Sequence, residues 1–385
     1  MATGSGSSTA NVVPATSAAR APRALVRLGT FPGVIVPGWK SLSVSNNSFS
    51  EADTFRIEFA ASALPASNNA NWFSTQKEVF AEILDGFPQD PTNPQAGELD
   101  SQIYGRIDDI VYNPRDGLIT VTGRDLTAAF IDSKISDQFQ NQTSSQIATM
   151  LAQAHGLTPV VTATFTKVGT YYTRDQVLMA ADRSEWDLLC WLAREEGFVV
   201  FVSGQSLFFE PDPRNTADPY MIRWQAPTST FGSPVANVKG ITFARSLTVA
   251  KGVSVTARSP SLTKKTAVTQ SYPTGPKTIA AGKSSPFGAT QQYFFTLPAG
   301  KTPTEVQAYA QKRYEDIISH EMKMSMHLPA DNLLTISTPI QVQGTGTAFD
   351  QIYFPRLITR EMNVKDGYNM TVESQNTSAD ESPSS

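Results

Sequence analysis

Residues 182–213 read DRSEWDLLCWLAREEGFVVFVSGQSLFFEPDP, and this stretch predicts one capped helix that runs directly into an antiparallel hairpin. Asp182 or Ser184 can cap the helix, because either side-chain oxygen can accept a hydrogen bond from a free amide of the first turn. Glu185, three residues after Asp182, fits a reciprocal capping box. Apolar residues at helical spacing predict one buried face. This face consists of Trp186, Leu189, Cys190 and Ala193.

The helix is expected to end at a glycine, and two strands are expected to follow it. Gly197 adopts the left-handed conformation at no steric cost, which suits the residue after a helix. Strand-like runs at 198–202 and 207–210 flank the polar turn 203–206. Helix, glycine and hairpin together indicate a structural building block rather than an active site.

The segment before residue 128 predicts β-structure. Short apolar alternations are separated by turn residues, and the run NPRDG at 113–117 predicts a tight reversal between the last two strands. Five or more such strands imply a barrel or a sandwich. The strand candidates are 41–45, 54–60, 78–84, 103–112 and 118–123.

Residues 128–215 predict a small α/β module. A first helix begins after the cap Thr143 and ends at Gly156, and an apolar strand follows at 160–163. The inner face of this helix is expected to consist of Ile147, Met150, Leu151 and Ala154. The order of cap, helix, glycine and strand repeats that of 182–213, which indicates a module inserted between β-rich regions.

The chain returns to β-structure after residue 238. Runs at 240–249 and 253–257 flank Ala-Lys-Gly and predict a hairpin, whereas the polar stretch 259–285 predicts a long loop and a candidate partner contact. Thr302, followed by proline and then by glutamate at the third helical position, predicts a helix over 303–319.

A methionine stripe predicts the next strand. Met322, Met324, Met326 and Leu328 alternate with polar residues, a period of two that fits a strand with one buried face. The stripe fits either a pliable partner surface or a core, and we favour the core. Further strands are expected at 340–343, 352–360 and 368–373, with Asp-Gly as the turn before the last.

Length and composition limit the classes of function. The chain has 385 residues, enough for two or three domains. It has 31 Lys and Arg residues against 35 Asp and Glu residues, which argues against tight nucleic-acid binding and remains compatible with DNA in transit. No apolar run approaches the roughly 20 residues that cross a bilayer, so no membrane span is expected. The single cysteine, Cys190, is expected to be buried and inert.

The two ends of the chain have the composition of flexible segments. Residues 1–22 are small and polar and predict a flexible N-terminal arm, although their Ser-rich, acid-poor character also fits an organelle transit peptide. Residues 379–385 predict a disordered tail.

No catalytic constellation is recognisable, so we expect no enzyme, no cofactor and no metal. The histidines fall at helix ends or on a polar strand face, and their spacing matches no zinc pattern. Adjacent carboxylates in a strand point to opposite sides and make a poor glycosidase pair. The groups considered are His155, His320 with Glu321 and His327, the pair Asp108 and Asp109, and the pair Glu195 and Glu196.

Four segments resemble a known family. They read GRDLTAAFID at 123–132, SEWDLLCWLAREEGF at 184–198, KGVSVTARSPSLTKK at 251–265 and ITREMNVKDGYNMTVES at 358–374. They are similar to the late control D family of tail proteins, which includes the central baseplate hubs of contractile phages and the hub part of VgrG spikes.

The resemblance implies an α+β, mainly β fold with two β-barrel hub domains. The first barrel would comprise 23–127 and the second 216–378 with its helix 303–319, while the α/β module 128–215 is inserted between them. Part of 211–240 is a candidate to return and pack on the first barrel.

The resemblance also implies a function. Three chains would form a homotrimer whose six barrels make a pseudo-sixfold ring, which adapts the hexameric tail tube to the trimeric spike and leaves a channel for DNA. Partners would be the tube protein, the spike protein and other baseplate or tape-measure proteins, in a virion assembled in the host cytoplasm. The cell-wall enzyme and the piercing tip are expected to be separate proteins. A tail-associated peptidoglycan hydrolase and a VgrG-type secreted spike component remain the alternatives.

Overall fold

The computed structural model shows a mainly β molecule, and the residues that it describes form three sheets, the largest of 14 strands. The structure describes residues 21–135, 139, 141–165, 184–229, 232–247, 253–261, 266–273, 291–297, 299–319 and 321–376. Nearly all of the predicted arm and the whole predicted tail lie outside these residues.

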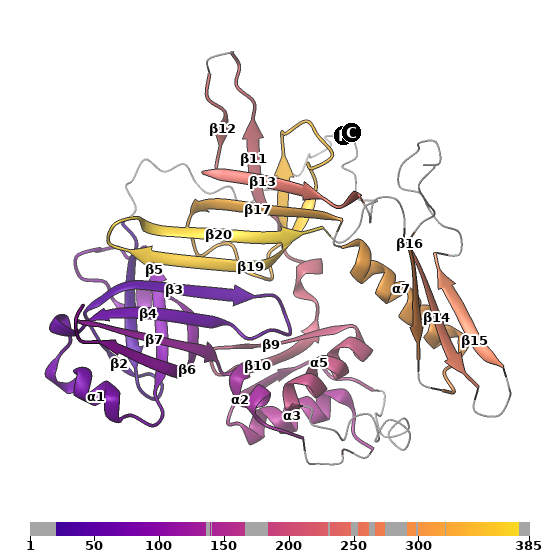
Figure 1. The fold of residues 1–385 in the computed structure, drawn as a ribbon, viewed down its shortest axis with the longest axis horizontal. Helices are drawn as coiled ribbons and strands as arrows, with labels where there is room; N and C mark the ends of the chain where they lie inside the picture. The colour runs from indigo at the N-terminus through magenta and orange to yellow at the C-terminus, as the bar shows by residue number, and fades with distance from the viewer. Residues whose placement is uncertain are drawn as a thin grey trace, which may run out of the picture.

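Eight antiparallel neighbours of the large sheet form one continuous surface, which we call the platform (Figure 1). They lie side by side in the order β13, β17, β20, β19, β3, β4, β7 and β6. Their bounds are Gly240–Arg245 (β13), Met322–Pro329 (β17), Gly367–Gln375 (β20), Ile352–Asn363 (β19), Trp39–Asn47 (β3), Thr54–Ala60 (β4), Leu118–Asp125 (β7) and Asp100–Asn113 (β6).

The platform consists of two halves with the same strand order. The first half is β3, β4, β7 and β6, and the second is β13, β17, β20 and β19. In each half the last two strands in sequence order form a hairpin, β6 with β7 and β19 with β20. A further strand pairs antiparallel with the first strand of each hairpin: β5 (Phe80–Gly86) with β6, and β18 (Ile340–Gln343) with β19. The chain therefore contains one topology twice.

The two hairpin turns also share their side-chain chemistry. Asn113 and Asn363 each end a strand, and each side-chain oxygen accepts backbone N–H bonds from the two residues that lie two and three positions ahead. Each amide nitrogen donates to the aspartate three positions on, at 2.6 Å for Asn113 and 3.2 Å for Asn363. Gly117 and Gly367 follow with φ of 63° and 75°, which favours glycine. The turn predicted from NPRDG is confirmed, and so is the Asp-Gly turn.

The strand pairing closes no barrel among the described residues. Next to β6 of the first half, the sheet continues through β5 to β1 (Arg23–Leu28) and β2 (Val34–Ile35). Next to β19 of the second half, it continues through β18 to β11 (Tyr220–Gln225) and β12 (Val235–Ala236). β11 thus pairs within the second β-region and not with a strand of the first. Both halves share one hydrophobic core.

The methionine strand was predicted correctly. Met322, Met324, Met326 and Leu328 of β17 are buried in the shared core, and the residues between them are exposed. The sequence did not predict β1, in which Ala24, Val26 and Leu28 are the buried residues.

The α/β module lies below the platform in Figure 1 and has its own core. It comprises α2 (Thr127–Asp132), α3 (Ser144–Ala154), β8 (Thr158–Val161), α5 (Glu185–Glu196), β9 (Phe198–Ser203) and β10 (Ser206–Pro211). The hairpin β9–β10 and the end of α5 at left-handed Gly197 are confirmed. The cap of α5 is Ser184, whose box partner is Asp187 and not Glu185. Asp182 lies outside the described residues.

The other helix of this module begins as predicted but has a shifted inner face. Thr143 caps α3 with Gln146 in a capping box. Ile147 and Leu151 are buried, whereas Met150 and Ala154 are exposed. Ala148 and Ala152 are buried in their place in the core of the module, so the inner face of this helix is shifted from the predicted one.

Residues 253–318 contribute a third, small core. Its sheet has the order β15, β14, β16, and helix α7 packs against it. The bounds are Val253–Pro260 (β14), Ala267–Tyr272 (β15), Gln291–Thr296 (β16) and Pro303–Ile318 (α7).

The structure corrects two predictions here and confirms one. The hairpin between 240–249 and 253–257 is wrong, because β13 pairs with β17 and β14 with β15 and β16. The stretch 259–285 is not only a loop, since it contains β15. Thr302 caps α7 as predicted. Residues 253–318 are inserted between β13 and β17. The corresponding strands of the first half, β3 and β4, follow each other directly in sequence.

Candidate functional site: the platform face and the pocket behind it

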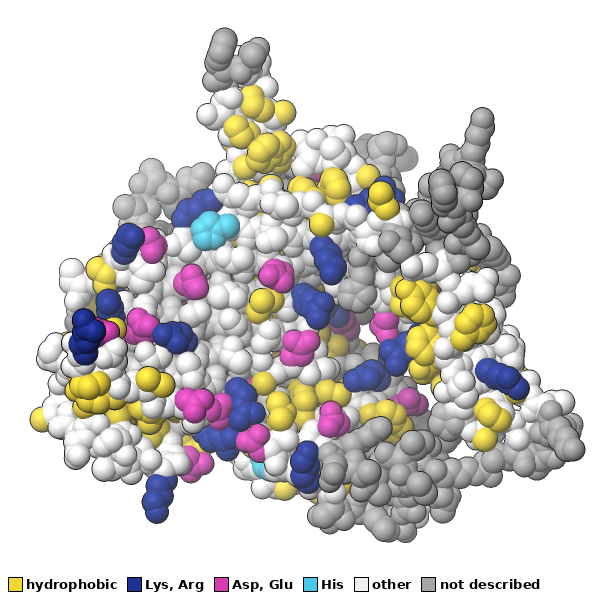
Figure 2. Space-filling view, in the orientation of Figure 1, with side chains coloured by type: hydrophobic (Ala, Val, Ile, Leu, Met, Phe, Trp, Pro, Cys, Tyr) yellow, Lys and Arg dark blue, Asp and Glu magenta, His cyan; other side chains and the backbone are white. Residues whose placement is uncertain are grey.

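The outer face of the platform is a broad polar surface (Figure 2). Strand alternation places one side chain in two on this face, and the paired registers carry the same alternation from strand to strand. Most of the outward side chains are small and uncharged. They include Thr242, Ser325, Thr371, Thr359, Ser45, Ser43, Thr54, Thr122 and Thr120.

Charges on this face are mixed in sign, and several of them form ion pairs. Arg56 donates to Glu58 at 2.7 Å, and this hydrogen bond holds the pKa of Glu58 below its ordinary value. Arg124 Nε donates to Asp108 at 2.7 Å, and Arg124 also contacts Asp132. Figure 2 shows the two signs interspersed and no belt of one sign. The charged residues of the face are Glu58, Asp108, Asp109, Glu361, Glu373, Arg56, Arg106, Arg124 and Lys323.

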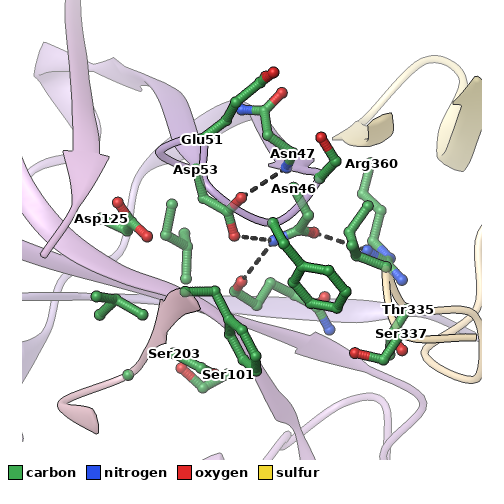
Figure 3. A pocket seen from close by; sticks show the side chains of 18 of the residues that line it. Asn46, Asn47, Glu51, Asp53, Ser101, Asp125, Ser203, Thr335, Ser337 and Arg360 are labelled. Carbon is green, nitrogen blue, oxygen red and sulfur yellow. Dashed lines mark hydrogen bonds between the residues drawn. The ribbon is translucent and has the colours of Figure 1, made fainter. Parts of the chain in front are cut away.

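A pocket of about 470 Å³ lies where the two halves and the α/β module meet (Figure 3). The end of β3 supplies Asn46 and Asn47, the turn after it supplies Asp53, the second half supplies Arg360, and the end of β9 supplies Ser203. The pocket is therefore a junction of three parts of the fold, and its residues decide how those parts are held together.

Arg360 is the central group of this junction and is only 2% exposed. Its guanidinium donates to Asn46 Oδ1 at 2.9 Å and to the backbone oxygens of Asp331 and Leu334. Asn46 in turn donates to Asp53 Oδ2 at 2.9 Å. The second half is thus tied to the first by a chain of side-chain hydrogen bonds, which Figure 3 displays in part.

Three carboxyl groups with raised pKa values lie at or beside this junction: half-buried Asp53 and buried Asp125 and Asp85. Burial raises the pKa of Asp53 to about 6, against opposing hydrogen bonds from Asn46 and Asn47. Burial, with Asp53 as a close negative neighbour, raises the pKa of Asp125 well above its ordinary value. Asp85 is fully buried, neither of its carboxylate oxygens has a hydrogen-bond partner of good geometry, and burial raises its pKa to about 6.

The α/β module is fastened to the β3–β4 turn at Ser50. This residue has a φ of 76°, which is rare outside glycine. Its amide donates to Val200 O at 3.0 Å, and its carbonyl accepts from Trp186 Nε1 at 2.9 Å and from Cys190 Sγ at 3.9 Å. Cys190 is buried, and burial raises the pKa of its thiol. The thiol is therefore placed for packing.

The groups of candidate catalytic residues that the structure describes lie apart from one another. His155 Nε2 contacts Glu185 at 2.5 Å between two helices of the α/β module. His327 contacts Thr371 at 3.3 Å on the platform face, and Asp108 is held by Arg124. Ser144 donates to Glu196 at 2.6 Å. His320 lies outside the described residues, and those residues contain no group of three potential metal ligands.

Helices long and apolar enough to span a membrane are absent from the part of the chain that the structure describes. The sequence did not single out Arg360, Asp53 or Asp85. Arg360 had a detectable signal, because it takes an inward position between the apolar Ile358 and Met362 in an alternating strand.

Comparison with solved structures identifies the fold. The 43 kDa tail protein of prophage MuSo2 from Shewanella oneidensis matches with a TM-score of 0.66 and 16% identity, covering 93% of this chain and 99% of that one. A tail protein from Neisseria meningitidis matches with a TM-score of 0.64 and 13% identity, covering 92% and 96%. The chain has the fold of these phage tail proteins.

A type VI secretion component of Escherichia coli, described as similar to the phage T4 tail proteins gp27 and gp5, matches with a TM-score of 0.50 and 13% identity over 92% of this chain and 77% of that one. No family model and no curated protein matches in sequence. At these identities the likeness establishes the fold.

Proposed function

We propose that this chain is a structural baseplate hub of a contractile phage tail or a related injection system. The observation that carries the proposal is the duplicated platform, in which one strand order occurs twice in one chain. The fold of phage tail proteins is consistent with this role. Each half, closed by its outer strands and by a neighbouring copy, would serve as one of the two barrels of the hub.

Duplication solves a symmetry problem in such a tail. A sixfold tube and a threefold spike cannot be joined by one repeated contact. Three copies of a chain with two similar halves present six similar surfaces on one side and keep threefold differences on the other. The extra α/β module and the small α7 module occur once per chain, so they would supply the threefold differences.

The platform face would line the channel of the ring. Its small hydroxyl side chains and paired charges offer no continuous cationic surface, so DNA and ejected proteins would pass without being held. The tube protein, the spike protein and other baseplate or tape-measure proteins would be the partners, in a virion assembled in the host cytoplasm.

The test is the mass of the purified full-length chain in solution, measured by native mass spectrometry over a range of concentrations. The proposal predicts a species of three times 41.7 kDa. A chain that stays monomeric at every concentration, or that forms only dimers, would contradict the proposed ring.

A further inference from the structure

Two strand edges of the platform are open, one at each end. β13 pairs with β17 alone among the described strands. β6 pairs with β5 from Asp100 to Arg106, and from Asp109 to Asn113 it pairs with β7 alone. Open edges present unpaired backbone groups that can accept another strand.

The internal duplication indicates what these edges accept. Because the shared turns align Asn113 with Asn363, β6 corresponds to β19, and the registers align Gly240 of β13 with Ser43 of β3. Within the chain β19 and β3 are paired to each other, with Thr359 opposite Ser45 and Glu361 opposite Ser43. The two open edges are thus the counterparts of the two strands that already join the halves.

We propose that β6 of one copy pairs antiparallel with β13 of the next copy, in the register that β19 and β3 use within the chain. Asp109 then lies opposite Thr242, and Val111 lies opposite Gly240. The inference rests on the proposed function, since it names the partner surface of the ring. Repeated head-to-tail, this contact joins the platforms edge to edge, and it leaves no open platform edge when the ring closes.

Side-chain exposure at the β6 edge supports this pairing. Tyr112 is 50% exposed although it lies opposite the fully buried Ile119 and so belongs to the inward side of the strand. The counterpart of Tyr112 is Met362, which is 5% exposed because β3 lies beside its strand. Within the chain, Val44 and Arg360 face each other across the internal junction. Ile241 is the counterpart of Val44, and Ile110 is the counterpart of Arg360. Two apolar side chains would therefore meet between copies.

Cysteine cross-linking tests the register directly. Opposed residues of antiparallel strands lie about 4.5–5.5 Å apart between Cα atoms, within the range of a disulfide. The full-length chain carrying both Asp109→Cys and Thr242→Cys should give covalent trimers under mild oxidation, on a non-reducing gel. The matched control carries Asn113→Cys and Ala244→Cys, which the proposed register holds about 20 Å apart. The unsubstituted chain reports on buried Cys190.

The outcomes separate this inference from the proposed function. Trimers that cross-link through 109 and 242 and not through the control pair support it. Trimers by mass that do not cross-link through 109 and 242 overturn the edge pairing and leave the ring in place. A monomeric chain overturns both.

A second variant pair tests the edge without a disulfide. Tyr112→Lys should lower the trimer fraction at least tenfold at a fixed concentration, because the proposed register places position 112 opposite Lys239 and the new side chain adds a like charge there. Val364→Lys, at a position 89% exposed in the counterpart turn, should leave the trimer fraction unchanged. Both positions are exposed in one copy, so neither change should unfold it. Equal assembly of the two variants would overturn the pairing.

Discussion

The strands β19 and β6 occupy the same place in the two halves of the platform, yet their surroundings differ. β19 is covered along its edge by β3, and its inward residues Arg360 and Met362 are buried. The corresponding stretch of β6 is open, and Tyr112 is half exposed. A duplicated fold therefore keeps its strand order at both sites but adapts the side chains of each edge to its own neighbour.

The difference is largest at one pair of counterparts. Arg360 reaches back from β19 to Asn46 and to two backbone oxygens of the loop at 331–334. Ile110, its counterpart on β6, has no polar group and packs at the margin of the shared core. A junction inside the chain is thus fixed by hydrogen bonds as well as by strand pairing.

The largest expected effect comes from removing the polar group of the internal junction. Arg360→Met should lower the free energy of unfolding by about 3–5 kcal/mol, because the oxygens that Arg360 satisfies become buried without partners. Urea unfolding at neutral pH measures the loss. Ile110→Met is the matched control and should cost less than about 1.5 kcal/mol. Equal losses in the two variants would refute the asymmetry between the junctions.

A smaller effect should depend on pH. Asp85, under the seam between the halves, has its pKa raised to about 6, so the folded chain binds its proton more tightly than the unfolded chain does. Stability from this group is present at low pH and is lost as pH rises from about 4 to about 6. Asp85→Asn should therefore stabilise the protein at pH 8 by roughly 1–3 kcal/mol and much less near pH 4.

Thermal unfolding of Asp85→Asn and of the unsubstituted chain at the two pH values tests this expectation. The control is Val364→Ala in an exposed turn, which changes no titratable group and should alter stability equally at the two pH values. A constant destabilisation of Asp85→Asn at both pH values would show that its carboxylate has a partner in the folded chain.

The smallest effect should be alike in the two halves. Asn113→Ala and Asn363→Ala each remove the side chain that organises a hairpin turn, and each should cost about 1 kcal/mol. Chemical unfolding of the two single variants checks the value. If one turn proves indispensable and the other neutral, the two hairpins are not equivalent elements.

Local features of the fold were predictable from sequence and long-range pairings were not. Alternation identified β17, and Asp-Gly identified both hairpin turns, because these signals lie within a few residues. The segments 240–245 and 253–260 are neighbours in sequence and belong to different sheets, so their proximity wrongly suggested a hairpin. A strand partner some 80 residues away leaves no local signal.

The candidate site was harder to predict for the same reason. The platform face arises from eight strands, and its continuity depends on the pairing of β19 with β3 across more than 300 residues. The junction pocket combines Asn46, Asp53 and Arg360, whose residue types are ordinary in their own segments. Their chemistry follows from burial, which only the assembled fold supplies.

Electron microscopy of the purified chain, viewed along the axis of its assembly, tests the central claim most directly. We predict a closed ring of three copies with an open centre and six similar lobes, two from each chain. A ring with three lobes only, an assembly without a central opening, or isolated single chains would contradict the claim that the duplicated platform converts threefold into sixfold symmetry.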